Sequence, residues 1–255
     1  MVFNNFFNIA FFVFGACVGS FLNVVALRLP QKKSFTSGRS HCPHCHKTLN
    51  WYELIPVLSF IIQGGKCRTC KKQFSWQYPA VEIATGIIFF LCWRNLSDSA
   101  VVLTLSLVLA ALLIIIFLID LRKFLILDAV TLPAGAVALL FSIAMGRSWL
   151  EILTGGLVGA GFFLIQFVLS RGKWIGGGDI RLGAVMGLAL GWQGLLIALF
   201  IAYICGSIIG IFLLATKKMT RKDQLPFGTF LSAATAVMMI YGASITQWFT
   251  QQLFL

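Results

Sequence analysis

About eight apolar runs, separated by short polar segments, limit this chain to one class of fold. Crossing the hydrocarbon core of a bilayer takes roughly 20 mainly apolar residues, and most runs approach that length, although some are short or interrupted by glycine. With 59% hydrophobic and 11% charged residues, the chain is too apolar for an ordinary soluble domain. We therefore expect an all-α integral membrane protein, a bundle of about eight transmembrane helices. The runs are 2–27, 79–93, 100–119, 125–145, 152–169, 182–191, 195–215 and 226–245.

The first run and the segment after it set the expected organisation. Residues 1–27 have no basic residue at their start and are followed by basic residues, so we interpret them as a retained helix and not as a signal peptide. Residues 28–78 are the only sizeable polar segment and are expected to form a loop outside the bilayer. Residues 79–255 contain the other runs and are expected to complete the bundle.

The positions of Lys and Arg predict the orientation of the chain. Eighteen of the 20 basic residues follow the first, third, fifth and seventh runs, and basic residues collect in cytoplasmic loops. These segments are therefore expected in the cytoplasm, with both termini and only Arg94 and Arg147 on the outer side. Topology thus accounts for the net charge of +12, and no nucleic-acid partner is expected.

The loop 28–78 contains two C-x-x-C pairs, Cys42 with Cys45 and Cys67 with Cys70, separated by 21 residues. Four thiolates at this spacing are typical of a tetrahedral Zn²⁺ site, and the reducing cytosol argues against disulfides. Because four protein ligands leave no open position, we favour a structural zinc over a catalytic one. No chemical role is expected for His41, His44, His46, Cys17, Cys92 and Cys205.

Acidic residues are scarce, and an ionisable group at or within a membrane helix marks a functional site by default. Asp120 ends the third run and Asp179 precedes the sixth, so both are expected at the cytoplasmic edge of the bilayer at the same depth. Taken singly, each could instead be a helix-terminal or capping residue. Asp128 is expected to cap the fourth helix. Glu82, early in the second, is a secondary candidate for helix-dipole stabilisation or ligand binding.

Glycines surround Asp179. Gly176, Gly177 and Gly178 precede it, and Gly183, Gly187 and Gly191 follow at intervals of four, which places them on one helix face. Such a face allows close packing of a neighbouring helix, such as the one with Asp120, or of a substrate segment. Gly155 and Gly159 are expected to serve helix packing alone.

Taken together, ordered motifs over nearly the whole chain resemble the type IV prepilin peptidases, membrane aspartic proteases with a GxGD signature. The matching segments are 19–24 (GSFLNV), 39–45 (RSHCPHC), 53–60 (ELIPVLSF), 65–70 (GKCRTC), 78–82 (YPAVE), 119–122 (IDLR) and 176–182 (GGGDIRL).

The resemblance implies that Asp120 and Asp179 are the catalytic pair and that the four cysteines form the family's zinc-type motif. It implies an enzyme of the bacterial plasma membrane, multi-pass and surrounded by lipid, whose active site faces the cytoplasm. Such enzymes remove the basic leader of prepilins or pseudopilins, and many then methylate the new N-terminus with S-adenosylmethionine. The short form, with 225–227 (LPF) before the last run, looks like the competence-associated branch.

Two positions depart from the family pattern, since Leu127 replaces a common proline and Arg181 a common lysine. Neither change removes a catalytic group. No Rossmann-type glycine fingerprint occurs in the loop, so methyl transfer depends on the resemblance alone. One alternative is a non-enzymatic adaptor whose zinc loop binds a partner of a pilus or DNA-uptake machine. A second alternative, a proton-coupled transporter, would place its ionisable groups nearer the bilayer midplane.

Overall fold

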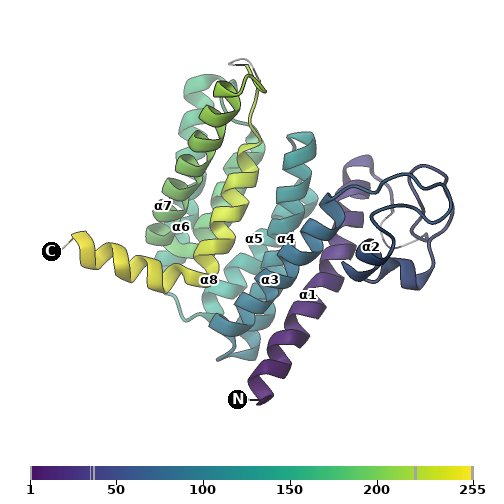
Figure 1. The fold of residues 1–255 in the computed structure, drawn as a ribbon. Helices are drawn as coiled ribbons and strands as arrows, with labels where there is room; N and C mark the ends of the chain where they lie inside the picture. Colours follow the sequence, from purple (N-terminus) through teal and green to yellow (C-terminus); the bar gives the residue numbers. More distant parts are fainter. Residues whose placement is uncertain (1, 35, 37, 221–222, 254–255) are drawn as a thin grey trace. The chain divides into compact units, whose positions relative to one another are not determined.

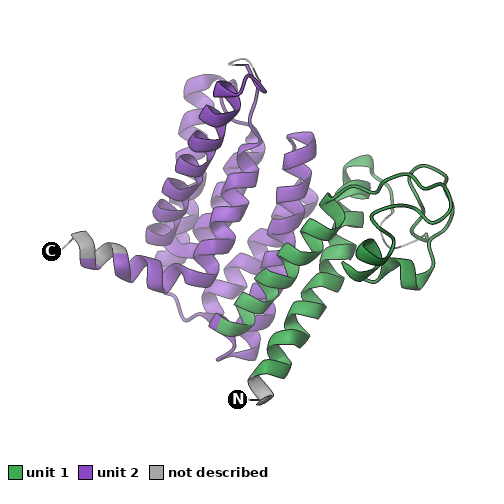
Figure 2. Cartoon of the chain, in the orientation of Figure 1, with its two compact units in different colours: residues 1–94 green, residues 95–255 purple. Residues whose placement is uncertain are grey.

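The computed structural model describes residues 2–34, 36, 38–220 and 223–253, and its regular elements are helices, with two isolated β-bridges in one loop. This confirms the expected all-α fold. The chain divides into two compact units, residues 1–94 and 95–255 (Figure 2). Arg221 and Lys222, two of the basic residues used to predict the orientation, lie outside the described residues.

The first unit is built on α1 (Val2–Arg28) and α3 (Gln77–Leu96) (Figure 1). Glycine lets the two helices approach closely, because a Cβ atom at Gly15 would lie 2.7 Å from the carbonyl oxygen of Thr85. Near one end of the pair, the rings of Phe11 and Trp93 stack with centroids 4.6 Å apart. The segment between the helices contains η1 (Leu29–Gln31), η2 (Trp51–Leu54) and α2 (Leu58–Ile62).

The second unit is a bundle of five helices in its described residues. In chain order they are α4 (Ala100–Lys123), α5 (Asp128–Ala144), α6 (Trp149–Ser170), α7 (Gly177–Ala215) and α8 (Phe227–Leu253).

Helix α7 is broken at Gly191, whose φ of 69° and ψ of 172° are not helical. Before the break, Gly183 and Gly187 lie against Gly159 and Gly155 of α6, so this half runs antiparallel to α6. After the break, a Cβ atom at Gly159 would also touch Leu195, and Tyr203 lies near Gln166, so the second half runs back along α6. The two predicted runs 182–191 and 195–215 are therefore the two arms of a helical hairpin.

Each of the eight predicted runs overlaps a helix, although the run 125–145 begins three residues before α5. Among the described residues, six helices are long and apolar enough to cross a membrane: α1, α3, α4, α6, α7 and α8. Helix α5 is apolar but shorter, with 17 residues.

Candidate active site and metal centre

Asp120 lies near the C-terminal end of α4, and its carboxyl group meets the N-terminal end of α8. The side chain is only 4% exposed, and its Oδ2 accepts a hydrogen bond from the backbone N–H of Thr229 at 2.8 Å. The first N–H groups of a helix have no partner within that helix, and its positive dipole end favours a carboxylate. The neighbouring Gly228 also lies against this carboxyl group, since a Cβ atom added there would lie 2.9 Å from the same oxygen.

Asp179 lies in the first turn of α7 and is 8% exposed. Its Oδ2 accepts a hydrogen bond from the backbone N–H of Gly176 at 2.9 Å, so Asp179, at the third helical position, caps the start of α7. The capping role considered for this residue is therefore real. It does not explain why the carboxyl group is buried in the bundle next to a second one.

The structure brings Asp120 and Asp179 within electrostatic range of each other, from elements 59 residues apart in sequence. Ile126, in the connection between α4 and α5, lies beside Gly178, which precedes Asp179, and Gly228, which adjoins Asp120. A Cβ atom at Gly178 would lie 2.7 Å from the Cβ of Ile126, and one at Gly228 would lie 2.9 Å from its Cδ1. Two glycines thus leave room for one isoleucine between the start of α7, which carries Asp179, and the start of α8, which contacts Asp120.

Sequence reasoning missed three neighbours of this pair: Gly228, Thr229 and Tyr203. Tyr203 interacts electrostatically with Asp179, and its hydroxyl donates a hydrogen bond to Oε1 of Gln166 at 3.1 Å. A Pro-x-Gly-Thr segment at the start of the last run was the available signal, because it combines a helix-start proline with a glycine that permits close approach.

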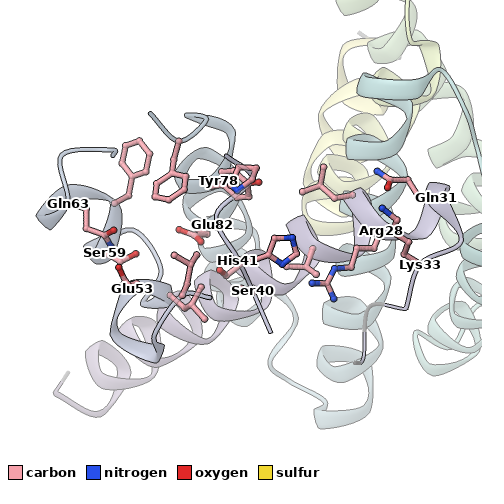
Figure 3. Close-up of a pocket in the computed structure, with 18 residues that line it drawn as sticks. Arg28, Gln31, Lys33, Ser40, His41, Glu53, Ser59, Gln63, Tyr78 and Glu82 are labelled. Carbon is pink, nitrogen blue, oxygen red and sulfur yellow. The ribbon is translucent and has the colours of Figure 1, made fainter. Parts of the chain in front are cut away.

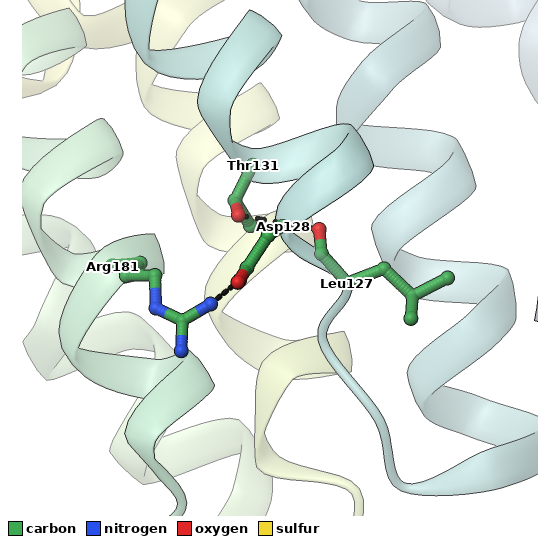
Figure 4. A network of polar contacts seen from close by, with 4 residues as sticks. All are labelled: Leu127, Asp128, Thr131 and Arg181. Atoms are coloured by element: carbon green, nitrogen blue, oxygen red, sulfur yellow. Dashed lines mark hydrogen bonds and ion pairs between the residues drawn. The ribbon is translucent and has the colours of Figure 1, made fainter.

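Asp128 does not act as the N-cap of α5, contrary to our expectation. The cap position is Leu127, and Asp128 occupies the first turn, where its carboxylate forms an ion pair with Arg181 of α7 (Figure 4). Both side chains are about half exposed, so the pair is of the weakly stabilising surface kind. It joins α5 to the turn of α7 that carries Asp179.

The glycine face of α7 packs against α6, and not against the helix that carries Asp120. A Cβ atom at Gly187 would collide with the carbonyl oxygen of Gly155, and one at Gly183 would collide with Gly159 and the ring of Phe163. The predicted close packing is thus confirmed with a different partner. This contact fixes the first arm of α7 and, with it, the position of Asp179 in the second unit.

The four cysteines of the loop converge on one point. Their sulfur atoms all lie within 4.8 Å of one another, and two pairs, Cys42 with Cys70 and Cys45 with Cys67, are 3.9 Å apart. Four sulfurs bound at about 2.3 Å to a tetrahedral zinc would be about 3.8 Å apart, so the group fits that ion. None of the three histidines belongs to this cluster among the described residues.

The two halves of the cysteine cluster have the same local fold. The N–H of Cys42 donates to the carbonyl of Lys47, and the N–H of Cys67 donates to that of Lys72, each at 2.9 Å. Hydrogen bonds from backbone groups of Cys70 and Thr69 lower the pKa of Cys67 to about 6. A backbone hydrogen bond from Lys47 lowers the pKa of Cys45, but desolvation and the neighbouring thiols outweigh it and raise the pKa to about 11. Crowded sulfurs of this kind need a cation before all four can ionise.

Known proteins match the sequence over both units. Residues 13–96 match the Bacterial Peptidase A24 N-terminal domain, and residues 107–211 match the Type IV leader peptidase family. A prepilin leader peptidase/N-methyltransferase of Bacillus subtilis is 34% identical over 93% of this chain and 96% of its own length. A protein of the same name from Aeromonas hydrophila is 31% identical over 93% of this chain and 92% of its own length. Another from Myxococcus xanthus is 37% identical over 82% of this chain and 63% of its own length. No solved structure matches significantly.

Proposed function

Because the chain belongs to the type IV leader peptidase family, we propose that it is a membrane-embedded aspartic endopeptidase that removes the leader of prepilins and then methylates the new N-terminus. The observation that carries the proposal is the meeting of Asp120 and Asp179, two buried carboxyl groups from separate helices. The relatives carry enzyme names, which argues against the non-enzymatic adaptor.

Asp120 and Asp179 are the proposed catalytic pair. Two neighbouring carboxyl groups share one proton more readily than both ionise, so one can accept a proton from water while the other protonates the leaving amine. The amide of Thr229 holds Asp120 and the amide of Gly176 holds Asp179, each through a single oxygen. Because a fixed backbone donor holds one oxygen, the direction of the other oxygen is restricted too, which favours a constant geometry for proton transfer.

We place this pair at the cytoplasmic edge of the plasma membrane. The basic residues Arg122 and Lys123 follow Asp120 directly, and Arg171 and Lys173 precede Asp179, as expected for cytoplasmic helix ends. A prepilin can then keep its apolar helix in the bilayer while its polar leader reaches the aspartates. Pilus assembly or competence is the process in which such a substrate would serve.

The four cysteines are proposed to hold a structural zinc through Cys42, Cys45, Cys67 and Cys70. Their sulfur spacing and the matching backbone turns support this role. The ion would supply a cross-link to a loop that has little apolar core of its own.

Methylation is proposed to use S-adenosylmethionine, a sulfonium compound. The bond between the methyl carbon and the sulfur breaks and its electron pair stays on sulfur, while the terminal amine of the cleaved pilin forms the new bond and loses a proton.

Expression of the chain together with a prepilin tests the proposal. We expect Asp120→Asn and Asp179→Asn to abolish shortening of the prepilin, whereas Asp98→Asn, which removes an exposed carboxylate between α3 and α4, leaves it intact. Mass spectrometry of the product reports the cleavage point and the N-methyl group together. Shortening by both aspartate variants at the wild-type level would refute the peptidase assignment.

A further inference from the structure

The first unit contains a cavity of about 390 Å³, large enough for one small-molecule ligand. Its walls come from the end of α1, from the loop that carries the cysteines and from the start of α3 (Figure 3). None of the groups assigned above to peptide cleavage lies in it.

Two buried carboxylates line this cavity. Glu53 is 8% exposed and Glu82 is 7% exposed. Glu53 accepts a hydrogen bond from the N–H of Asn50 at 2.9 Å, and Glu82 accepts one from the N–H of Val57 at 2.8 Å. Within the described part of the chain, neither forms an ion pair. Buried carboxylates of this kind are costly unless a cation accompanies them.

A third acceptor in the wall has no partner. The Oε1 atom of Gln63 is buried and forms no hydrogen bond within the described residues. Figure 3 shows Gln63 and Glu53 toward the same end of the cavity, with Glu82 next along it. Within the described residues, the two carboxylates therefore lack a cationic partner and the Gln63 oxygen lacks a donor.

The rest of the wall combines apolar, basic and neutral polar side chains. Phe60, Phe74 and Tyr78 provide aromatic surface. Arg28 and Lys33 lie toward the opposite end from Gln63 in Figure 3. A ligand that fits has a cationic centre for the carboxylates, a flat ring for the aromatic surface and an anionic group for Arg28 and Lys33.

We propose that this cavity binds the methyl donor, with Glu53 and Glu82 facing its positive charge. S-adenosylmethionine combines a permanent sulfonium cation and an ammonium group with an adenine ring and a carboxylate. Its amino groups and hydroxyls supply donors for Gln63, and Arg28 and Lys33 match its carboxylate. A basic leader peptide also carries positive charge, but a cavity of this volume suits one small molecule better than a peptide segment. The inference rests on the methyltransferase part of the proposed function.

Ligand binding to the full-length protein in lipid nanodiscs tests the assignment. The probe is sinefungin, a methyl-donor analogue in which a carbon that carries a protonatable amine replaces the methylsulfonium centre, titrated by calorimetry. We expect Glu53→Gln and Glu82→Gln to weaken binding by about tenfold or more each, because a paired charge is lost with little change of shape. Asp98→Asn removes an exposed carboxylate outside the cavity and is expected to bind as the wild type does.

Prepilin cleavage by the same samples reports whether the variants are folded. If a glutamine variant loses cleavage together with sinefungin binding, that variant is no evidence for the cavity, so labelled S-adenosylmethionine is photocrosslinked to the wild type instead. We expect the label on peptides that contain Phe60 or Tyr78. Label confined to residues 95–255, or unchanged sinefungin affinity in both glutamine variants, would overturn the assignment. If the assignment is overturned but the wild type still methylates its product, the proposed function stands and the methyl donor binds elsewhere.

Discussion

The carboxylate of Asp120 accepts a hydrogen bond from the backbone amide of Thr229, 109 residues further along the chain. Asp120 is near the last turn of α4 and Thr229 is in the first turn of α8. The hydrogen bond therefore places the N-terminal end of α8 next to a proposed catalytic group. A backbone donor cannot swing away as a side chain can. The position of the Asp120 carboxyl group therefore depends on how closely α8 approaches α4.

Gly228→Ala is expected to impair cleavage without unfolding the protein. The added Cβ atom would lie 2.9 Å from both Oδ2 of Asp120 and Cδ1 of Ile126, so the carboxyl group must shift. Because misplacement of a catalytic group by about 1 Å can cost roughly 100-fold in rate, we expect a 10- to 100-fold fall in kcat, about 1.4 to 2.7 kcal/mol. Timed prepilin cleavage by the purified enzyme measures it.

Gly242→Ala on the same helix is the matched control. A Cβ atom there would meet only the Cε of Met238, at an ordinary 3.7 Å, so cleavage should stay within about twofold of the wild type. Equal rates for the Gly228 and Gly242 variants would show that the approach of α8 to Asp120 does not limit catalysis.

The sequence was sufficient to predict that Asp120 and Asp179 come near each other, while their shared place at a membrane edge stays a prediction. It was not sufficient to identify what lies beside them. The contact of Asp120 with Thr229 depends on the packing of two helices far apart in the chain, and no local pattern encodes a partner.

The glycine face of α7 illustrates the same limit. Spacing of four correctly predicted a face for close packing, but several helices could have filled it, and Gly155 and Gly159 of α6 do so. The capping prediction for Asp128 failed because Arg181, one helix turn beyond a helix start elsewhere in the chain, offers a charged partner. Propensity arguments consider only local partners for such a residue.

Metal content tests the cysteine site. We expect about one zinc per chain in the purified protein and its loss in Cys67→Ser, because three thiolates bind Zn²⁺ much more weakly than four. Affinity should fall as pH falls, since each thiol must lose a proton to bind. Elemental analysis at several pH values measures both effects. Cys205→Ser, an exposed cysteine of α7, serves as the control and should retain the metal.

Gly187→Ala is expected to destabilise the second unit. A Cβ atom there would collide with the backbone of Gly155, and overpacking of this kind typically costs about 1 to 3 kcal/mol. Gly161→Ala on α6 meets nothing within 4 Å and should be neutral or stabilising, because alanine favours helix more than glycine does. Thermal unfolding in detergent compares the two variants. Equal Tm values would mean that α6 and α7 are not packed through this face.

The break in α7 is stabilised from α5 and the turn after it. Ending the first arm at Gly191 leaves carbonyl groups without helical partners. The Ser142 hydroxyl donates to the carbonyl of Leu188 at 2.6 Å, and the Arg147 guanidinium donates to that of Ala189. Arg147→Met keeps an apolar stem but removes the guanidinium donor, so we expect the free energy of unfolding to fall by about 1 to 3 kcal/mol, with a lower Tm.

Arg94→Met is the matched control for this change. Arg94 is the other basic residue expected on the outer side, it is exposed, and its guanidinium lies over the ring of Phe90 at 6.0 Å. Such an exposed contact contributes at most about 1 kcal/mol, so its loss should shift Tm less than loss of Arg147. If the two variants unfold at the same temperature, the carbonyl groups at the break are satisfied without Arg147, and the hairpin of α7 depends on Ser142 and helix packing.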